Sequence, residues 1–232
     1  MNREEFKNKC EERGLALTER QLEQYDEYAS FLVEYNEKVN LTAIVEYEAI
    51  LEKHFYDSLL LSFEKKIEGN FVDVGTGAGF PGVVLKIAYP SLKVILLEPL
   101  QKRCVFLNEL IKRLGLLDIE VVNVRGEDYS LKKREAFDYV SARAVTNLNA
   151  LIEVAGTMVK EGGYFIALRG SSGQEEIANA NNAISQMGFA IEKTYEERLA
   201  DGSLRIISFM KKIKETPKKY PRKYSIIKQR PL

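Results

Sequence analysis

The stretch that most constrains the fold is the run Phe71-Val-Asp-Val-Gly-Thr-Gly-Ala-Gly-Phe-Pro-Gly82. It is typical of a short apolar strand, a glycine-rich turn and a helix that opens at Pro81. Glycines at 75, 77 and 79 allow positive φ and leave out the side chains that would block a ligand. Proline suits the first helical position, where its missing N–H costs nothing. The run therefore predicts a loop that a nucleotide-like cofactor can approach closely.

The pattern after this run predicts an α/β fold with a doubly wound sheet. Apolar strands and helical stretches alternate, which favours parallel strands joined by right-handed crossovers. The expected strands lie at about 71–74, 93–98, 119–124, 137–141 and 163–168, and the expected helices near 81–88, 101–115, 147–158 and 175–187. Two last strands, at about 189–195 and 204–210, are expected to form an antiparallel hairpin through Ala200-Asp-Gly-Ser. Ligands of such sheets bind at the carboxyl ends of the strands.

The segment before the glycine run is expected to be a helical extension. Thr18 and Gln21 have the spacing of a capping box. After them, apolar and aromatic residues recur at helical spacing, which is typical of a core face. A further helix is expected from about Glu46 to Phe63. The predicted division is an extension over 1–65, an α/β domain over 66–212 that carries the glycine run, and a basic tail over 213–232.

Composition excludes several classes of protein. Two cysteines, Cys10 and Cys104, are too few for a disulfide framework, and no Cys/His cluster suggests a metal. No apolar run approaches membrane-spanning length, and the polar N-terminus does not resemble a signal peptide. A cytoplasmic, monomeric enzyme without a metal or a membrane partner is the default expectation.

The zero net charge hides a segregated basic end. From Lys211 to Leu232 there are nine Lys or Arg residues and one acid, a charge of +8 that the rest of the chain balances with −8. Tyr220 and Tyr224 lie among these cations, and rings interleaved with cations suit stacking on unpaired bases and contact with phosphates. A solubilising, disordered tail is the alternative. The pattern favours a nucleic acid partner.

The kind of cofactor follows from the residues around the glycines. Gly77, Gly79 and Gly82 match the dinucleotide fingerprint, and an acid, Glu98, follows downstream, so a NAD-dependent oxidoreductase is one alternative. The additional acid inside the strand, Asp73, makes the run resemble motif I of class I S-adenosylmethionine-dependent methyltransferases. That resemblance implies a Rossmann-like sheet and S-adenosylmethionine (SAM) as cofactor.

The sequence lacks the motifs that several kinds of methyltransferase need, and this narrows the range of possible methyl acceptors. Ser141-Ala-Arg-Ala-Val145 stands where amine methylases carry Asn/Asp-Pro-Pro-aromatic, and neither cysteine is well placed to attack a pyrimidine. Nothing marks Lys86 or Lys160 as the base that ribose methylation needs. Guanine N7 already carries a free lone pair, so its methylation needs alignment and charge support alone. A protein or small-molecule acceptor, or a nucleic-acid-binding protein without chemistry, remain as alternatives.

Beyond the glycine run, the chain resembles the GidB/RsmG family, the bacterial small-subunit (16S) ribosomal RNA guanine-N7 methyltransferases. The matching elements span most of the chain: Tyr35-Asn-Glu-Lys-Val-Asn-Leu-Thr42, His54-Phe-Tyr-Asp-Ser-Leu59, 73–82, Lys102-Arg103, Ser141-Ala-Arg-Ala144 and Thr216-Pro-Lys-Lys-Tyr-Pro-Arg-Lys223. The sequence departs from the family at Tyr35, where Trp is frequent, and after Lys223, where Gly-Thr-Pro is missing. The second departure affects the expected contacts of the tail.

The resemblance implies roles for individual residues. Gly75 and Phe80 should line the methionine side of SAM, Glu98 its ribose, and Gly126 and Glu127 its adenine. The full expected cofactor set is Asp73, Gly75, Gly77, Gly79, Phe80, Glu98, Gly126, Glu127 and Arg143. The expected RNA-binding set is Lys102, Arg103, Arg169, Arg205, Lys218, Lys219, Arg222 and Lys223. No catalytic acid or base is expected.

Three residues carry more specific expectations. Asp73 is expected to organise the glycine loop and the amino group of the cofactor. Arg143, at the carboxyl end of the fourth strand, is expected to close the pocket as a positioning residue, although an arginine there could also pair with an acid. The single histidine, His54, is expected to be structural, with an RNA-facing position as the alternative.

Overall fold

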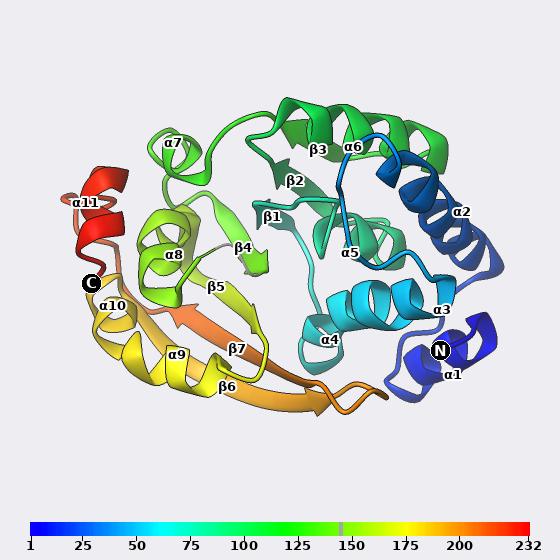
Figure 1. The fold of residues 1–232 in the computed structure, drawn as a ribbon. Coiled ribbons are helices and arrows are strands. Elements are labelled where there is room, and N and C mark those ends of the chain that lie inside the picture. Colours follow the sequence, from blue (N-terminus) through cyan, green and yellow to red (C-terminus); the bar gives the residue numbers. More distant parts are fainter. Residues whose placement is uncertain (144–145) are drawn as a thin grey trace.

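A computed structural model describes residues 1–143 and 146–232, and within them the strands form one seven-stranded sheet in the order β3-β2-β1-β4-β5-β7-β6. The strands are β1 (Asn70–Val74), β2 (Lys93–Leu97), β3 (Ile119–Val122), β4 (Phe137–Arg143), β5 (Val159–Arg169), β6 (Phe189–Arg198) and β7 (Leu204–Lys212). β1 to β5 are parallel, and β7 runs antiparallel between β5 and β6. The predicted parallel sheet and final antiparallel hairpin are confirmed (Figure 1).

Helices cover both faces of this sheet (Figure 1). They are α1 (Arg3–Glu12), α2 (Glu19–Asn36), α3 (Tyr47–Ile50), α4 (Asp57–Glu64), α5 (Gly82–Ala88), α6 (Gln101–Leu114), α7 (Gly126–Ser130), α8 (Leu148–Ala155), α9 (Gly173–Asn179), α10 (Asn181–Gln186) and α11 (Tyr224–Gln229). Successive strand residues point to opposite faces, so Phe71 joins the core under α1, α2, α5 and α6 while Val72 joins the core under α8 to α10.

The predicted elements differ from the observed ones in a few places. The helix expected over 46–63 is divided into α3, a π-helical segment η1 (Leu51–Tyr56) and α4, and the helix expected over 147–158 ends as a 3₁₀ turn, η2 (Gly156–Met158). The helix expected over 175–187 breaks at Ala180 into α9 and α10, in a run rich in asparagine, whose side chains compete for backbone groups. Neither α7 nor α11 was predicted, since each spans only five or six residues and is too short for a helical repeat to be recognised.

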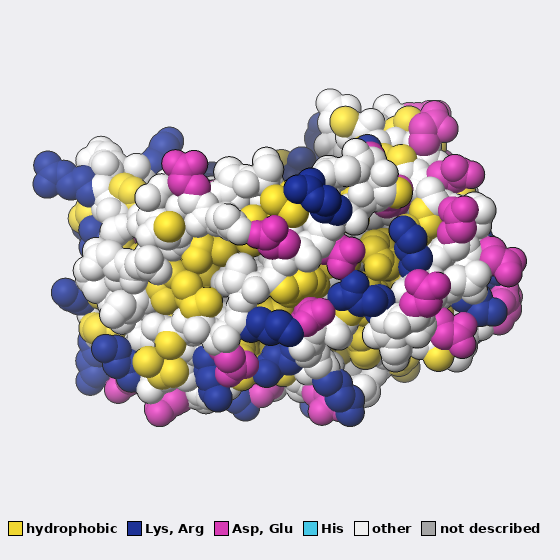
Figure 2. All heavy atoms as spheres, turned by 90° about the horizontal axis from the view of Figure 1, so that it is seen from below, with side chains coloured by type: hydrophobic (Ala, Val, Ile, Leu, Met, Phe, Trp, Pro, Cys, Tyr) yellow, Lys and Arg dark blue, Asp and Glu magenta, His cyan; other side chains and the backbone are white. Residues whose placement is uncertain are grey.

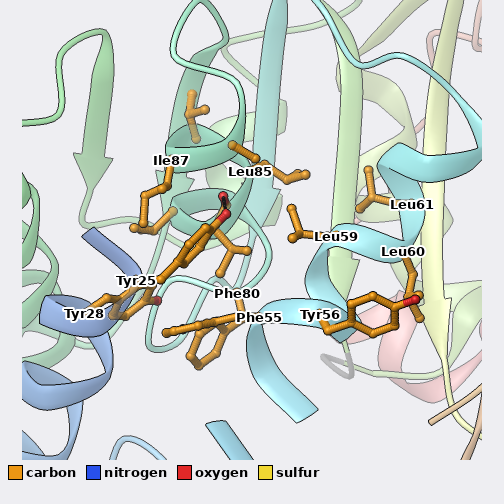
Figure 3. Close-up of a cluster of buried hydrophobic side chains, with 14 of the residues drawn as sticks. Tyr25, Tyr28, Phe55, Tyr56, Leu59, Leu60, Leu61, Phe80, Leu85 and Ile87 are labelled. Carbon is orange, nitrogen blue, oxygen red and sulfur yellow. Dashed lines mark hydrogen bonds between the residues drawn. The ribbon is translucent and has the colours of Figure 1, made fainter. Parts of the chain in front are cut away.

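The N-terminal extension packs directly on the glycine loop. Figure 3 shows Tyr25 and Tyr28 of α2 beside Phe55 of η1 and Phe80 of the loop. The Tyr28 hydroxyl donates to the carbonyl of Ala78 at 2.5 Å, and the Tyr25 hydroxyl donates to the carbonyl of Val84 at 2.9 Å. The extension therefore supports the loop from behind. The capping box at Thr18 is confirmed.

The basic C-terminal segment also packs on the fold. The Tyr220 ring is 4% exposed, and its hydroxyl donates to Gln186 Oε1 of α10. Ile227 of α11 is buried against Ala150 and Val154 of α8. The expectation that Tyr220 stacks on bases is therefore wrong, because its ring is already covered by the protein. Tyr224 is exposed.

Neither cysteine is exposed, as expected for packing residues: Cys10 is fully buried and Cys104 is 3% exposed. Burial raises the pKa of the Cys10 thiol to about 12, so it stays protonated. Among residues 1–143 and 146–232, none of the helices combines the length and the apolar composition that crossing a bilayer requires.

Candidate active site

The loop after β1 has the conformation that its glycines suggest. Gly75, Gly77 and Gly79 have φ of 68°, 62° and 103°, values that residues with a Cβ rarely adopt. A Cβ at Gly77 would meet nothing within 4 Å, so this side of the loop is open. A Cβ at Gly79 would lie 2.6 Å from the Tyr28 hydroxyl, so that glycine allows α2 to approach. One glycine thus leaves room for a ligand and another for the supporting helix.

Asp73 holds this loop together. It is fully buried, and its Oδ2 accepts hydrogen bonds from Thr76 Oγ1 at 2.7 Å and from the amide of Gly82 at 2.8 Å. Its other oxygen, Oδ1, has no hydrogen-bond partner among the described residues. Burial raises the pKa of Asp73 to about 6, against the opposing effect of these two hydrogen bonds. Asp73 therefore organises the loop as predicted, and Oδ1 is left as a buried acceptor for a cationic donor.

Glu98 joins the end of β2 to the same loop. Its side chain is 2% exposed, and its two oxygens accept from the amides of Gly77 at 3.0 Å and Leu100 at 2.9 Å. Arg103 approaches Glu98 Oε2 to 3.9 Å, whereas Lys102 is exposed. The carboxylate retains lone pairs that these two amides do not occupy.

The end of β3 completes this side of the site. Gly126 opens α7, and a Cβ there would lie 2.7 Å from Val74 Cγ1 at the end of β1. Glu127 follows it and lies 3.8 Å from Arg125. The structure thus brings the ends of β1, β2 and β3 together around the glycine loop. Of the residues expected to hold a cofactor, Asp73, the glycines, Glu98 and Glu127 lie there, whereas Arg143 lies at the end of β4.

A cleft of about 740 Å³ opens at the carboxyl ends of the next strands, β4 and β5. Arg143 ends β4, Arg169 ends β5, and both side chains line the cleft. The other lining residues come from η1, α4, α9, β7 and the segments around them: Lys53, His54, Asp57, Thr146, Asn147, Leu168, Gly170, Ser172, Glu176, Arg205 and Ile207. Arg143, Arg169 and Arg205 were predicted as site residues. Ala144 and Val145, which belong to the expected motif after β4, lie outside the described residues.

One buried carboxylate, that of Asp57, binds two of these arginines. Asp57 Oδ1 lies 2.8 Å from Arg205 Nε, and Asp57 Oδ2 lies 3.3 Å from Arg143 Nη1. Burial raises the pKa of Asp57, and the two guanidinium groups counteract that effect. Sequence reasoning missed this role, although Asp57 lies within a quoted motif. The signal that could have revealed it is an acid that directly precedes the apolar run of the helix expected over 46–63.

His54 is fixed as a neutral imidazole in the wall of the cleft. Its Nε2 lies 2.8 Å from Thr42 Oγ1, and Arg143 Nη2 approaches its Nδ1 to 3.5 Å. Burial, and then the charge of Arg143, lower the pKa of His54 to about 3. With Nδ1 as acceptor, Nε2 carries the proton and donates to Thr42. His54 is thus structural, and it also borders the cleft.

Phe80 is more deeply buried than is needed to line the methionine side of SAM. Its ring is 5% exposed and stacks on His54, with 4.4 Å between ring centres. The Arg143 guanidinium lies 4.8 Å from the centre of the Phe80 ring. Phe80 therefore joins the glycine loop to Arg143, and its contact with a cofactor stays a prediction.

The cations predicted to bind RNA are in different environments. Arg169 is 7% exposed, and Arg222 forms a two-point ion pair with the buried carboxylate of Glu153. Lys218, Lys219 and Lys223 are exposed on the tail, which packs beside α8 away from α1 and α2 (Figure 1). Figure 2 shows one face of the molecule, where Lys and Arg side chains alternate with acidic and hydrophobic ones. Among the described residues, no group of three or more His, Cys, Asp and Glu side chains could hold a metal ion.

The fold and this geometry together define a class of enzyme. The strand order, the glycine loop after β1 and the acids at β1 and β2 are those of a class I SAM-dependent methyltransferase fold. An O-methyltransferase from Bacillus cereus in complex with SAH has the same fold, with a TM-score of 0.58 and 18% identity over 80% of this chain and 91% of that one. A 16S rRNA adenine-N1 methyltransferase from Catenulisporales acidiphilia, solved with its cosubstrate SAM, has a TM-score of 0.52 and 13% identity, over 64% of this chain and 86% of that one.

Sequence comparison identifies the family. The chain belongs to the family GidB, rRNA small subunit methyltransferase G, whose model matches residues 21–198. The protein of that name from Bacillus cytotoxicus is 45% identical over 96% of this chain and 95% of its own length. Its counterpart from Lysinibacillus sphaericus is 41% identical over the full length of both. The family identified from the sequence is confirmed, and the oxidoreductase alternative is excluded.

Proposed function

We propose that this protein transfers a methyl group from SAM to N7 of one guanine in small-subunit ribosomal RNA. The cofactor is expected at the ends of β1, β2 and β3, and the guanine in the cleft lined by Arg143, Arg169 and Arg205. The cytoplasmic location and monomeric state expected from the sequence are part of this proposal.

The loop after β1 fits SAM. The unpartnered, buried Oδ1 of Asp73 suits a cationic amino group, and the open side of Gly77 leaves room for the ligand. Glu98 retains lone pairs for ribose hydroxyls, and Gly126 and Glu127 would flank the adenine. When bound, SAM supplies a methyl group made electrophilic by its sulfonium. The residues of this chain bind and orient it.

The observation that supports the choice of N7 is that each described acid and the histidine lining the cleft already lie against a cation or a hydrogen-bond donor, which makes them weak bases. Both Asp57 oxygens face arginines, both His54 nitrogens have partners, and Glu176 faces Ser172 and Arg169. Such groups are poorly placed to remove a proton from an acceptor. Guanine N7 has no proton to lose, so alignment against the cofactor and support of the new positive charge suffice.

The distribution of cations supports RNA as the acceptor. Arginines line the cleft, and exposed lysines of the tail lie elsewhere on the surface. A flipped guanine could enter the cleft while the phosphates beside it bind the rim, and more distant phosphates could bind Lys218, Lys219 and Lys223. A small molecule or a protein segment would not need these separated cations.

The test combines a binding measurement with a chemical map of the product. Calorimetric titration with SAM, and with NAD as control, should show micromolar binding of SAM alone. After incubation with SAM and unmethylated small subunits, or with their extracted RNA, borohydride and aniline treatment cleaves the RNA at N7-methylguanosine. Cleavage at one guanine supports the proposal. Methylation without such cleavage would show that N7 is not the acceptor atom.

A further inference from the structure

Arg169 is a buried cation with unused donors at the inner wall of the cleft. Its side chain ends β5 and is 7% exposed. Glu176 Oε2 lies 3.4 Å from its Nε, but neither Nε nor Nη2 makes a hydrogen bond to any described residue. Burial lowers the pKa of Arg169 without a well-aligned partner to offset the cost. Since Arg169 lines the cleft and its guanidinium is incompletely hydrogen-bonded, a ligand in the cleft has a cationic donor available to it.

Glu176 lies beside Arg169 with acceptor capacity to spare. Its Oε1 accepts from Ser172 Oγ at 2.8 Å, and its side chain is 29% exposed to the cleft. A carboxylate offers about four acceptor positions, so these neighbours leave some free. The α9 backbone that carries Glu176 is closely packed on the sheet, because a Cβ at Gly173 would lie 2.7 Å from Arg169 Cβ and 2.9 Å from Ile206 Cβ. The two charged groups are therefore held side by side on rigid elements.

Glu176 on α9 and Arg169 on β5 line one part of the cleft, whereas Arg143 lines the part next to the glycine loop. Arg143 contacts Phe80 of that loop, and α9 packs on β7. A base that points N7 toward the glycine loop turns its opposite, Watson–Crick edge toward the other wall. For guanine, that edge carries the N1–H and N2–H₂ donors next to the O6 acceptor.

We propose that Glu176 and Arg169 recognise the guanine acceptor, with Glu176 accepting from N1–H and N2–H₂ and the guanidinium of Arg169 donating to O6. This inference rests on the proposed function and assigns the recognition of the base to named residues. Adenine would place an acceptor, N1, against the carboxylate and a donor, the N6 amino group, against the guanidinium, so both contacts would fail. A site built to hydrogen-bond a particular group rejects an analogue that lacks it.

The same pair also favours the reaction. Methylation at N7 leaves a positive charge on the base and makes N1–H more acidic. The hydrogen bonds from N1–H and N2–H₂ to Glu176 therefore become stronger as the methyl group is transferred. Interactions that strengthen in the transition state raise the rate as well as the affinity.

The test measures methylation rates of Glu176→Gln and of the parent protein. The two RNA substrates differ only in the N2 amino group of the acceptor base. Small-subunit RNA assembled by splinted ligation would carry either guanine or inosine at the mapped site. Inosine keeps N1–H, O6 and N7 and lacks only the N2 amino group. The parent is expected to lose roughly ten- to a hundredfold in kcat/KM on inosine. Glu176→Gln should lose more on guanine than on inosine, because inosine already lacks the contact from the N2 amino group and has only the N1–H contact left to lose.

The neighbouring variant Glu175→Gln is the matched control, because Glu175 is exposed and outside the cleft. It should retain the parent's rates on both RNAs and the parent's melting temperature, and both variants should retain the parent's affinity for SAM. Glu176→Gln is expected to melt at a lower temperature, because the buried Arg169 loses its charged neighbour. The rates are therefore compared between the two RNAs for each protein, below its own melting temperature. If the parent methylates guanine N7 but Glu176→Gln discriminates against inosine as strongly as the parent, the assignment to Glu176 is wrong. If the parent itself produces no N7-methylguanine, the proposed function fails instead.

Discussion

Asp57 and Arg143 come from segments 86 residues apart and meet with 3.3 Å between Oδ2 and Nη1. The other oxygen of Asp57 lies 2.8 Å from Arg205 Nε. The start of α4 thus links the end of β4 to β7 across the cleft wall. Because the N-terminal helices carry this carboxylate, they form part of the cleft wall and also support the glycine loop.

Replacing Asp57 with Asn should therefore disturb stability and catalysis together. Asp57→Asn leaves two guanidinium groups without their shared anion, which is expected to cost about 2–4 kcal/mol in the free energy of unfolding. Methyl transfer should fall at least tenfold, because Arg143 loses its fixed position. Denaturant unfolding and methylation rates measure both effects.

Glu64→Gln is the control from the same helix. Glu64 pairs with Arg13 and Lys193 on a more exposed surface, so its replacement should cost about 1 kcal/mol or less and leave the methylation rate unchanged. Equal effects of the two variants on the rate would mean that the position of Arg143 does not depend on Asp57.

Two tyrosines of α2 offer a matched pair for testing support of the glycine loop. Tyr28→Phe removes the hydrogen bond to Ala78 inside the loop, and Tyr25→Phe removes the equivalent bond to Val84 in α5. Each change should cost about 1–2 kcal/mol of stability. Only Tyr28→Phe should weaken SAM binding, by about threefold or more, in a calorimetric titration. A similar loss of affinity in both variants would assign the effect to general destabilisation.

The tail should be tested by neutralising charges and not by truncation. A deletion from Lys211 onward would remove the end of β7 and the buried Lys212. The triple variant Lys218→Gln, Lys219→Gln, Lys223→Gln changes exposed residues alone. It should weaken RNA binding and reduce the salt dependence by about 0.7 per lost phosphate contact, with SAM affinity unchanged.

Arg222→Gln is the contrasting variant in the tail. It leaves the carboxylate of Glu153, which has no exposed surface, without its two-point partner. Stability should therefore fall by about 2–4 kcal/mol, whereas the triple lysine variant should melt like the parent. If the lysine variant binds RNA with an unchanged salt slope, the tail does not contact phosphates.

Much of the site could be predicted because it follows local rules. Asp73, the glycines and Glu98 lie at strand ends, where parallel sheets bind their ligands, and their spacing along the chain reveals them. The partners of the arginines could not be predicted, since Asp57 and Arg143, or Glu153 and Arg222, meet only through the tertiary fold. The π-helical segment that carries His54 has no local signal either, because its residues suit an ordinary helix equally well.

His54 should make stability depend on pH below neutrality. Its pKa is lowered to about 3 in the folded protein, from an ordinary value near 6.5, so the unfolded chain binds more protons between these values. Stability is therefore complete above about pH 6.5 and decreases as the pH falls. Between these two pKa values, the loss of unfolding free energy from this group should approach about 1.4 kcal/mol per pH unit.

The measurement is the difference in unfolding free energy between the parent and His54→Gln from pH 7 to pH 4. Gln keeps an acceptor for Arg143 and a donor for Thr42 but does not titrate. The parent should lose stability relative to this variant as the pH falls. Parallel curves would mean that His54 titrates normally in the folded protein.

Asp73 should affect stability and cofactor binding in opposite directions. Its pKa is raised to about 6 by burial, so the folded protein binds more protons than the unfolded chain between an ordinary value near 3.8 and about 6. The stability contributed by the protonated form is present below about pH 3.8 and is lost as the pH rises through about 6. Asp73→Asn cannot ionise, so the variant does not lose this stability as the pH rises. Its amide oxygen can still accept from Thr76 and Gly82, as Oδ2 does. At pH 8 the variant should therefore be at least as stable as the parent.

Binding of SAM is expected to require the ionised form of Asp73, because a carboxylate attracts a cationic amino group and an amide does not. The parent's affinity for SAM should fall roughly tenfold between pH 7 and pH 5 as Asp73 takes up a proton. Asp73→Asn should bind SAM weakly at both pH values. Calorimetric titration of the two proteins at these values measures the effect. An equal fall in affinity in both proteins would place the titrating group elsewhere, whereas a flat profile in the parent would show that Asp73 stays ionised throughout this range. The expected result means that the buried acid costs folding free energy and is retained for the cofactor.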